Sequence, residues 1–351
     1  MAYTTINKST SYFNTKLYTG NGSAGNAQTG VGFQPDFLWI KNRTASQEHW
    51  LADAVRGTTK FLESNSGNAE SSDGATGLAS FDSDGFTVNG SARTNQNSAS
   101  MVAWNWKAGT TGSGTTTGSG TGKAYSYSVN TTSGFSVVKY LGNGTAGHTI
   151  PHHLGAVPKA IFVKRIDAVN NWTAYNVGIG NTYGLYLDTS DNKVDSNAFW
   201  YDTTPTSSVF TLGDGASVNN SSGTYIAYVF TDKTGYSKFG SYTGNGNADG
   251  TFVYTGFKPA MVIIKNAAAN EHWRMYDNKR DSYNLMYKCL FPNLNSIENT
   301  TNNGSEEIDF LSNGFKIKSS SGQLNGTNQS HIYMCFGQSL VGSNNIPCTA
   351  R

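Results

Sequence analysis

Residues 242–266 read YTGNGNADGTFVYTGFKPAMVIIKN, and related stretches occur at two earlier places in the chain. The first begins at Tyr18 with YTGNG and continues to GFQPDFLWIKN. The second begins at Tyr140 with YLGNG and continues to GAVPKAIFVKR. The copies start at positions 18, 140 and 242, a spacing of about 100 residues, which is the length of a small domain. This recurrence predicts three units with one architecture.

The repeated stretch predicts strands rather than helices. Asn-Gly pairs take positive φ readily, so each YxGNG predicts a strand that ends in a tight turn. A proline, which cannot donate to a sheet, precedes a run of four apolar residues in each copy and suits the start of a strand. The length and β-branched content of these runs predict strands buried on both faces: 37–40, 160–163 and 261–264. A basic residue follows each run and is expected to return the chain to solvent: Lys41, Lys164 and Lys265.

Composition excludes several classes of protein. Of the 351 residues, 14% are charged, against about 25% in an average soluble protein. The 25 Lys and Arg and 23 Asp and Glu residues leave a net charge of +2, so we find no electrostatic footprint for nucleic acid or an anionic membrane. No apolar run approaches the length of a membrane-spanning helix, and no secretory signal is recognisable, so we expect a soluble protein made in the cytosol. The three cysteines form a poor disulfide framework, and reduced thiols are expected: Cys289, Cys335 and Cys348.

We predict an all-β fold of three tandem antiparallel β-sandwich domains, of the jelly-roll or lectin-like kind. The predicted divisions are a first sandwich at 1–107, a linker at 108–122, a divergent second sandwich at 123–234, a third at 235–338 and a tail at 339–351. The linker, AGTTGSGTTTGSGTG, has no apolar side chain larger than alanine and is flexible in isolation. If it holds one conformation, we expect it to lie against a neighbouring domain or another subunit. Short helical turns are expected only within 51–62 and 284–290.

Candidate chemical sites are few. His148, His152 and His153 flank Pro151 with a spacing that could offer two imidazoles to one metal, but no carboxylate or cysteine accompanies them, so a polar loop is the favoured interpretation. The segment 82–85, DSDG, opens like a calcium loop but lacks the later bidentate Glu, so we expect a turn. No catalytic set recurs in matching positions. We therefore predict that the protein is not an enzyme and uses no metal or cofactor.

Aromatic and paired charged residues suggest packing and recognition. Trp50, Trp172 and Trp273 follow the buried strand in each unit, and this equivalence favours a core position over sugar binding. Two Asp and Arg pairs share one spacing after His-Trp and are expected to form local ion pairs: Asp53 with Arg56, and Asp277 with Arg280. The better surface candidates for recognition lie in loops of the second unit, which has no counterpart for them elsewhere: Trp200, Tyr201, His152 and His153.

The third unit resembles a domain of unknown function that is common in structural proteins of tailed bacteriophages, marine ones especially. The similarity lies in GFKPA at 256–260, VIIKN at 262–266 and DFLSNGFK at 309–316. The first unit is similar through GFQPDFLWIKNR and DSDGFTVNG, whereas the second matches only at the turn, the proline and the strand. The resemblance implies a virion protein with a jelly-roll or lectin-like sandwich, and it carries over no catalytic residues.

Two functions are consistent with this resemblance. The first is host attachment by a tail fibre or adhesin, whose loops contact a host surface glycan or protein. The second is capsid decoration or a head fibre, in which the sandwiches cover and brace the particle. In either case we expect a virion protein assembled in the host cytoplasm, with other virion proteins as partners and a homo-oligomer, preferably a trimer, as the functional form. No contact with nucleic acid and no membrane insertion are expected.

Overall fold

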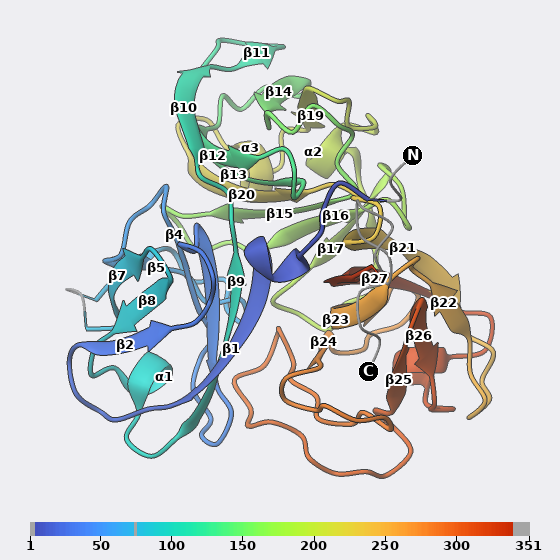
Figure 1. Ribbon diagram of the computed structural model, residues 1–351. Coiled ribbons are helices and arrows are strands. Elements are labelled where there is room, and N and C mark those ends of the chain that lie inside the picture. Colours follow the sequence, from blue (N-terminus) through green and yellow to red (C-terminus); the bar gives the residue numbers. More distant parts are fainter. Residues whose placement is uncertain (1–3, 74–75, 340–351) are drawn as a thin grey trace.

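The computed structural model describes residues 4–73 and 76–339, and strands predominate within them (Figure 1). Helix accounts for 6% of the residues and strand for 42%, which confirms the all-β class. The helices in this part of the chain are single turns: η1 (Ser9–Ser11), α1 (Ala92–Asn95), α2 (Asn197–Trp200), α3 (Ala216–Asn219) and α4 (Gly322–Asn325). None of them lies within 51–62 or 284–290, where we expected helical turns, because those residues pair with neighbouring strands instead.

Repeat 1, defined here as the strands between Phe13 and Trp106, contains a main sheet and a small sheet. The main sheet has the order β1-β9-β3-β4, and the small sheet has the order β2-β8-β7. A two-stranded pair, β5-β6, completes the repeat. The strands are β1 (Phe13–Thr19), β2 (Asn26–Thr29), β3 (Phe37–Asn42), β4 (Trp50–Asp53), β5 (Lys60–Phe61), β6 (Ser71–Ser72), β7 (Leu78–Asp82), β8 (Gly85–Val88) and β9 (Ser100–Trp106).

Repeat 3, defined as the strands between Ser237 and Gln338, has the same arrangement. Its main sheet has the order β21-β27-β23-β24 and its small sheet the order β22-β26-β25. In both repeats the last strand of the main sheet lies between the first strand and the strand that carries the apolar run. The strands are β21 (Ser237–Thr243), β22 (Phe252–Tyr254), β23 (Lys258–Asn266), β24 (Arg274–Asp277), β25 (Ile308–Leu311), β26 (Gly314–Ile317) and β27 (Ser330–Gln338).

Repeat 2, defined as the strands between Phe135 and Phe230, keeps this order and extends it. Its main sheet contains β13-β20-β15-β16, and its small sheet contains β14-β19. Two strands, β17 and β18, continue the main sheet beyond β16. The strands are β13 (Phe135–Leu141), β14 (His148–Pro151), β15 (Ala160–Arg165), β16 (Thr173–Asn176), β17 (Tyr183–Tyr186), β18 (Val194–Asp195), β19 (Val209–Leu212) and β20 (Thr224–Phe230).

The segment 108–122, expected to be a linker, contributes strands to repeat 2. It forms β10 (Thr110–Thr115) and β11 (Thr117–Gly118). β10 pairs with β12 (Ala124–Asn130), which pairs with β13, while β11 pairs with β14. The expectation of a bare connection was wrong because alternating threonine, serine and glycine residues can pair as strands when a neighbouring edge is available. The expectation that the segment lies against a neighbouring domain agrees with this pairing.

Each main sheet lies between two apolar cores. One face contributes to a central core that contains residues of all three repeats, such as Trp104, Tyr228 and Met334. The other face packs against the small sheet of its own repeat in a local core, as Leu38 does with Phe86 in repeat 1. In Figure 1 the three main sheets surround the middle of the molecule. The three repeats therefore share a core and are not separately packed units.

Three aromatic side chains meet in the central core, one from the last strand of each main sheet. Trp106, Phe230 and Phe336 occupy the same register position, opposite the first residue of each repeat. Their ring centroids lie 6.4 Å (Trp106 to Phe230), 5.7 Å (Trp106 to Phe336) and 5.7 Å (Phe230 to Phe336) apart, and all three contacts are edge-to-face. This arrangement is the favoured geometry for aromatic pairs. It gives the molecule an approximate threefold axis.

The recurring YxGNG sequence is explained by contacts with the short helix before the last strand of each repeat. In repeat 1 the Tyr18 hydroxyl donates to the Thr94 carbonyl, and the Asn21 N–H donates to Oδ1 of buried Asn95 at 2.9 Å. Gly20 is required because a Cβ there would lie 2.1 Å from a backbone carbonyl oxygen. The same contacts recur as Tyr140 with Val218, Asn143 with Asn219, Tyr242 with Leu324 and Asn245 with Asn325.

Candidate functional site

The three lysines expected to return the chain to solvent are fully buried. In repeat 2 the Lys164 ammonium donates to the carbonyls of Arg165 and Asn170 and, across the repeat boundary, to Gly67 of repeat 1 at 3.1 Å. The other two lysines make the same kind of crossing: Lys41 to Asn295 of repeat 3, and Lys265 to Ser190 of repeat 2. Burial lowers the pKa of Lys164 to about 8. The expectation of solvent contact was wrong because carbonyls of the neighbouring repeat replace water.

The three tryptophans assigned to the core are buried, as predicted. Two of them also cross a repeat boundary, since Trp172 Nε1 donates to the Glu63 carbonyl and Trp273 Nε1 donates to the Tyr186 carbonyl. His49 makes the corresponding contact at the third boundary, where its Nε2 lies 3.0 Å from the Phe291 carbonyl. Because Nδ1 of His49 accepts from Trp39 Nε1, the ring proton is on Nε2, and Nε2 is the donor.

Trp50 is not the structural equivalent of the other two tryptophans. In the strand pairing of the main sheets, Trp50 occupies the position of Thr173 in repeat 2 and Arg274 in repeat 3, each of which follows the tryptophan of its repeat. His49 therefore occupies the position that corresponds to Trp172 and Trp273. Since successive side chains in a strand point to opposite faces, Trp50 enters the local core of repeat 1. There it stacks on Phe61 with a centroid distance of 3.8 Å. The sequence comparison had aligned His49-Trp50 with His272-Trp273 because the two dipeptides are identical, and so it missed this shift of one residue.

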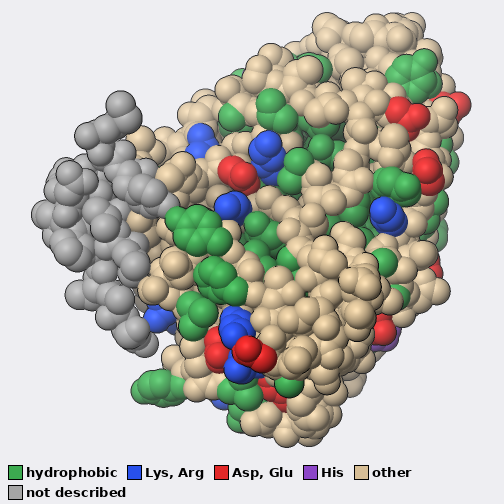
Figure 2. Space-filling model, turned by 90° about the vertical axis from the view of Figure 1, so that its right-hand side faces the viewer, with side chains coloured by type: hydrophobic (Ala, Val, Ile, Leu, Met, Phe, Trp, Pro, Cys, Tyr) green, Lys and Arg blue, Asp and Glu red, His purple; other side chains and the backbone are tan. Residues whose placement is uncertain are grey.

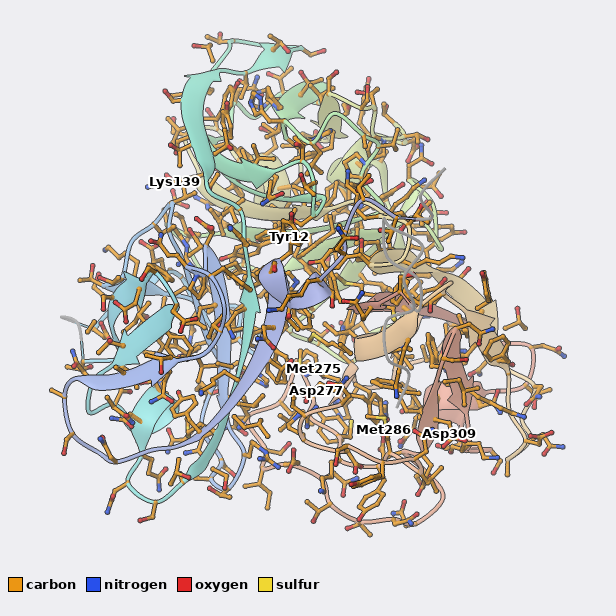
Figure 3. All side chains as sticks on the ribbon, in the orientation of Figure 1. Tyr12, Lys139, Met275, Asp277, Met286 and Asp309 are labelled. Atoms are coloured by element: carbon orange, nitrogen blue, oxygen red, sulfur yellow. The ribbon has the colours of Figure 1, made fainter. Side chains whose placement is uncertain are left out.

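Both predicted Asp and Arg pairs are present and fully buried. Nε of the arginine lies 2.5 Å from Oδ2 of the aspartate in each: Arg56 with Asp53, and Arg280 with Asp277. Each aspartate also accepts a hydrogen bond from the next repeat: Asp53 from the Tyr228 hydroxyl at 2.8 Å, and Asp277 from Trp104 Nε1 at 3.1 Å. In Figure 3 Asp277 lies near the middle of the molecule.

Repeat 2 has Asn176 at the position of these aspartates, and its Nδ2 donates to the Tyr333 carbonyl of repeat 3 at 3.3 Å. Each of the three boundaries thus has one lysine contact, one indole or imidazole contact and one carboxylate or amide contact, although the asparagine of repeat 2 donates where the two aspartates accept. The buried charged and aromatic groups that could suggest an active site are therefore occupied in holding the repeats together.

The recognition surface expected in repeat 2 is largely internal. Trp200 is only 1% exposed and packs edge-to-face on Tyr175 in the local core, so its assignment to the surface was wrong. The physical reason is that α2 ends at Trp200 and turns this side chain inward, while the next residue takes a left-handed conformation. Tyr201 is 47% exposed and is the one aromatic residue of that loop that reaches solvent as predicted.

The histidines of the same repeat do not converge. His152 is buried, with Nε2 3.2 Å from the Thr206 carbonyl, and burial lowers its pKa to about 4, so its placement on the surface was wrong. His153 is half-buried and stacks on Tyr127 with a centroid distance of 3.7 Å. His148 is buried between Asn219 and Thr116. Among the described residues, no group of three or more His, Cys, Asp or Glu side chains is placed to hold a metal ion.

A different pair of aromatic side chains is exposed on repeat 3. Phe252 and Tyr254, called here the aromatic pair, are 44% and 54% exposed. They flank buried Val253 on β22, the outer strand of the small sheet, and so point to the same solvent face. Gly314, opposite Tyr254, lets the two strands approach closely, since a Cβ there would lie 2.1 Å from the Val253 carbonyl oxygen and 3.0 Å from the Phe252 ring. The sheet thus supports two neighbouring rings against solvent.

Charged side chains border the aromatic pair. Lys238 Nζ lies 5.3 Å from the centroid of the Tyr254 ring, within the range of a cation–π contact. Lys316 is directly opposite Phe252 in the sheet and forms an ion pair with Asp249. Figure 2 shows the side of the molecule on which β22 lies, where hydrophobic side chains gather between basic and acidic ones. The site offers aromatic faces beside hydrogen-bonding groups.

The other repeats have no such pair. The equivalent positions flank Gln28 in repeat 1 and Ile150 in repeat 2, each of which faces a phenylalanine as Val253 does. They hold small or β-branched residues and a proline: Ala27, Thr29, Thr149 and Pro151. Sequence reasoning missed the pair because it lies inside the repeated stretch, where we looked for similarity. The signal was the alternation of aromatic residues around Val253, which predicts a strand with one exposed face.

A cleft of about 440 Å³ lies in the same repeat. Met286 and Phe310 supply part of its apolar lining, and Tyr283, 82% exposed, is also part of its wall. The Asn284 side chain does not face the cleft freely, because it exchanges two hydrogen bonds with the backbone of Phe310. The lining is mixed, because charged and polar side chains such as Lys279, Asp281 and Ser282 also surround this apolar recess.

Comparison with known proteins places the chain in a family. A family model described as a domain of unknown function, DUF7483, matches residues 8–339, which include all three repeats. The chain belongs to the DUF7483 family. No curated protein and no solved structure gives a match to the DUF7483 chain. Over residues 4–73 and 76–339, its helices are too short to cross a membrane.

Proposed function

We propose that this chain is a non-enzymatic protein of the exterior of a tailed bacteriophage particle, and that it attaches the particle to a host by binding surface carbohydrate. The observation that carries the proposal is the aromatic pair, Phe252 and Tyr254. Both rings are exposed on a strand whose core position is already filled by Val253. Packing within the repeat does not require them, because repeats 1 and 2 form the same sheet without aromatic residues there.

Carbohydrate suits the chemistry of this site. Exposed aromatic faces stack on the apolar faces of sugar rings, and the neighbouring Lys238, Lys316 and Asp249 can exchange hydrogen bonds with hydroxyl groups. A shallow site of this kind binds weakly when isolated. Many copies on one particle raise the overall avidity without any new contact, so a weak site is sufficient for attachment.

Decoration of the capsid is the second candidate. It is favoured by the inter-repeat contacts at the three boundaries, which make the chain a rigid body suited to bracing a surface. Decoration needs no ligand at the aromatic pair, and this difference separates the two candidates.

We also propose that each repeat is a β-sandwich unit of the jelly-roll or lectin-like kind, whose main and small sheets form the two layers.

The test is binding of the purified chain to an array of bacterial lipopolysaccharides and capsular polysaccharides. We expect the parent to bind at least one polysaccharide, and Phe252→Ala/Tyr254→Ala to bind it at least about tenfold more weakly. Removal of one aromatic anchor commonly costs more than about 1 kcal/mol, so two removals together exceed a factor of ten. Tyr283→Ala, which removes an exposed aromatic ring from the cleft, is the matched control and should bind like the parent.

Two results would contradict attachment through this site. One is a double variant that remains folded and binds as tightly as the parent. The other is a parent that binds no polysaccharide and does not delay phage adsorption, together with labelling of the protein on phage heads by electron microscopy. The second result would favour decoration.

A further inference from the structure

β10 is the outermost strand of the eight-stranded sheet of repeat 2. It pairs with β12 on one side only, and its sequence, TTGSGT, is exposed at every residue except Gly112, which is half-buried. In Figure 1 it lies at the outer border of the molecule, beside repeat 2. Alternate N–H and C=O groups of such a strand point away from the sheet. They are available to another strand.

β10 lacks the devices that protect exposed edges in native proteins. Those devices are charged side chains, proline, bulges or a covering segment. β10 has no charged residue and no proline, and its pairing with β12 runs without a bulge from Thr110 opposite Val129 to Thr115 opposite Ala124.

The corresponding edges of the other repeats carry charged groups. On β1 the Lys16 ammonium donates to the Thr29 carbonyl of the small sheet at 2.8 Å. On β21 the Phe239 N–H donates to the Asp232 carboxylate at 3.0 Å, which occupies a backbone donor of that strand. The other end of the eight-stranded sheet is β18, a strand of two residues that includes exposed Asp195. β10 differs from all of these.

The strand is held in a defined position. Gly112 lies opposite Tyr127, and Gly114 lies opposite Tyr125. A Cβ at Gly112 would approach the Tyr127 hydroxyl oxygen to 2.6 Å, and one at Gly114 would approach that of Tyr125 to 2.8 Å, so the tyrosine side chains cover the two glycines. His153 stacks on Tyr127 and supports this layer. β10 therefore already has a defined strand conformation in the single chain, without a partner strand on its outer side.

We propose that β10 pairs with β10 of a second copy of this chain, in antiparallel orientation about a twofold axis. A twofold axis perpendicular to the sheet keeps the side-chain faces matched and puts either Gly112 or Ser113 opposite itself. In both registers only glycine, serine and threonine residues face one another, so no charges oppose. The pairing joins two sheets and covers both open edges at once, as a closed twofold interface does. Head-to-tail addition would instead require the short β18 edge.

We propose this dimer of two chains in place of the trimer expected from the sequence, because three repeats already surround an axis within one chain. The inference does not depend on carbohydrate binding by repeat 3. It is tested by the mass of the full chain in solution, measured by light scattering after gel filtration across the micromolar range. We expect twice the 37.6 kDa of one chain. A monomer or a trimer at all concentrations would overturn the proposal.

Charge variants test whether β10 is the contact. Thr111→Lys/Ser113→Lys places like charges opposite one another in either register and should give monomers with an unchanged melting temperature. Mixing it with Thr111→Asp/Ser113→Asp should restore dimers that contain one chain of each kind. Ala27→Lys/Thr29→Lys, at two exposed positions of the edge strand β2, is the matched control and should remain dimeric. A dimer that persists in the β10 lysine variant would overturn the proposal, since the contact would then lie elsewhere.

Discussion

The backbone N–H of Trp172 donates to Oδ1 of Asp188 at 3.0 Å, and this contact is one of three equivalent contacts around the axis. Repeats 1 and 3 use an asparagine oxygen as the acceptor: Asn65 Oδ1 accepts from the backbone N–H of His49, and Asn293 Oδ1 accepts from the backbone N–H of Trp273. Only repeat 2 uses a carboxylate. Burial raises the pKa of Asp188 from 3.8 to about 6, because the charged form loses water.

Replacing Asp188 by asparagine is therefore expected to stabilise the protein at pH 7. The raised pKa means that the native state binds the proton more tightly than the unfolded state, so the parent loses stability as the pH rises from about 4 to about 6. Asp188→Asn keeps the acceptor for Trp172 and removes the charge, which should add about 1 to 3 kcal/mol to the free energy of unfolding at pH 7.

Urea denaturation at pH 4, 5, 6 and 7 would measure the effect of Asp188→Asn. The gain should be smallest at pH 4, where the parent carboxyl is protonated. Asp191→Asn, at an exposed carboxylate nearby, is the control and should change little at any pH. A variant less stable than the parent at pH 7 would show that attraction to Lys164 outweighs burial.

Trp273→Ala is expected to lower the free energy of unfolding by about 3 to 5 kcal/mol, as for other large-to-small changes in a core. The side chain is 1% exposed in the central core, and its Nε1 donates to the Tyr186 carbonyl of repeat 2. Trp273→Phe keeps most of the ring volume but leaves that carbonyl without its donor, so its cost should be about 1 to 3 kcal/mol.

Calorimetry can follow both Trp273 variants. Because the central core is shared, we expect a single transition that moves to lower temperature as a whole. Separate melting of repeat 3 in Trp273→Ala, with repeats 1 and 2 unchanged, would contradict a shared core.

Lys164→Met should destabilise the protein although it replaces a buried charge by an apolar side chain of similar length. The variant removes the ammonium donor from the backbone carbonyls of Gly67, Arg165 and Asn170, and of these the Gly67 carbonyl keeps the Asn170 N–H as a donor. An acceptor left unpaired inside the protein costs about 1 to 3 kcal/mol before relaxation. We expect a net loss of about 2 to 4 kcal/mol in chemical denaturation. Lys139→Met, at a half-exposed lysine of β13, is the control. Equal stability of Lys164→Met and the parent would mean that the boundary does not need this contact.

The buried thiols are expected to report on unfolding. Cys289 and Cys335 are fully buried, and burial raises the pKa of Cys289 to about 12, so little thiolate forms at pH 8. Alkylation at pH 8 followed by peptide mapping should therefore modify both residues only in denaturant. Cys348 lies outside the described residues and is scored separately. Rapid modification of Cys289 in the native protein would contradict its burial.

Part of this fold could be predicted from the sequence because local chemistry determines it. The turns after Tyr18, Tyr140 and Tyr242 and the apolar runs were recognisable from short-range patterns. The central core was not, because it depends on contacts between residues more than 100 positions apart, such as Trp104 with Asp277. The burial of Lys41, Lys164 and Lys265 was missed because each donates to a carbonyl of another repeat, 75 or more positions away in the sequence.

The candidate site was harder to predict than the fold. The sequence suggested Trp200 because it had no counterpart in the other repeats, but a residue without a counterpart can serve the local core of its own repeat. Exposure of Phe252 and Tyr254 depends on which face of β22 packs against the main sheet, and that packing is set by long-range contacts. The Asp53 and Asp277 pairs were predictable because each partner lies only three residues away.

The boundary contacts also bear on how such a chain can evolve. Every boundary joins unlike surfaces in the same direction, and the series closes after three repeats, which is the geometry of a homotrimer. In a homotrimer each substitution appears three times and must be tolerated at three places. Fusion of the three copies into one chain removes that restriction. One copy could then acquire Phe252 and Tyr254, and another the added strands of 108–122, while the contacts around the axis stayed alike.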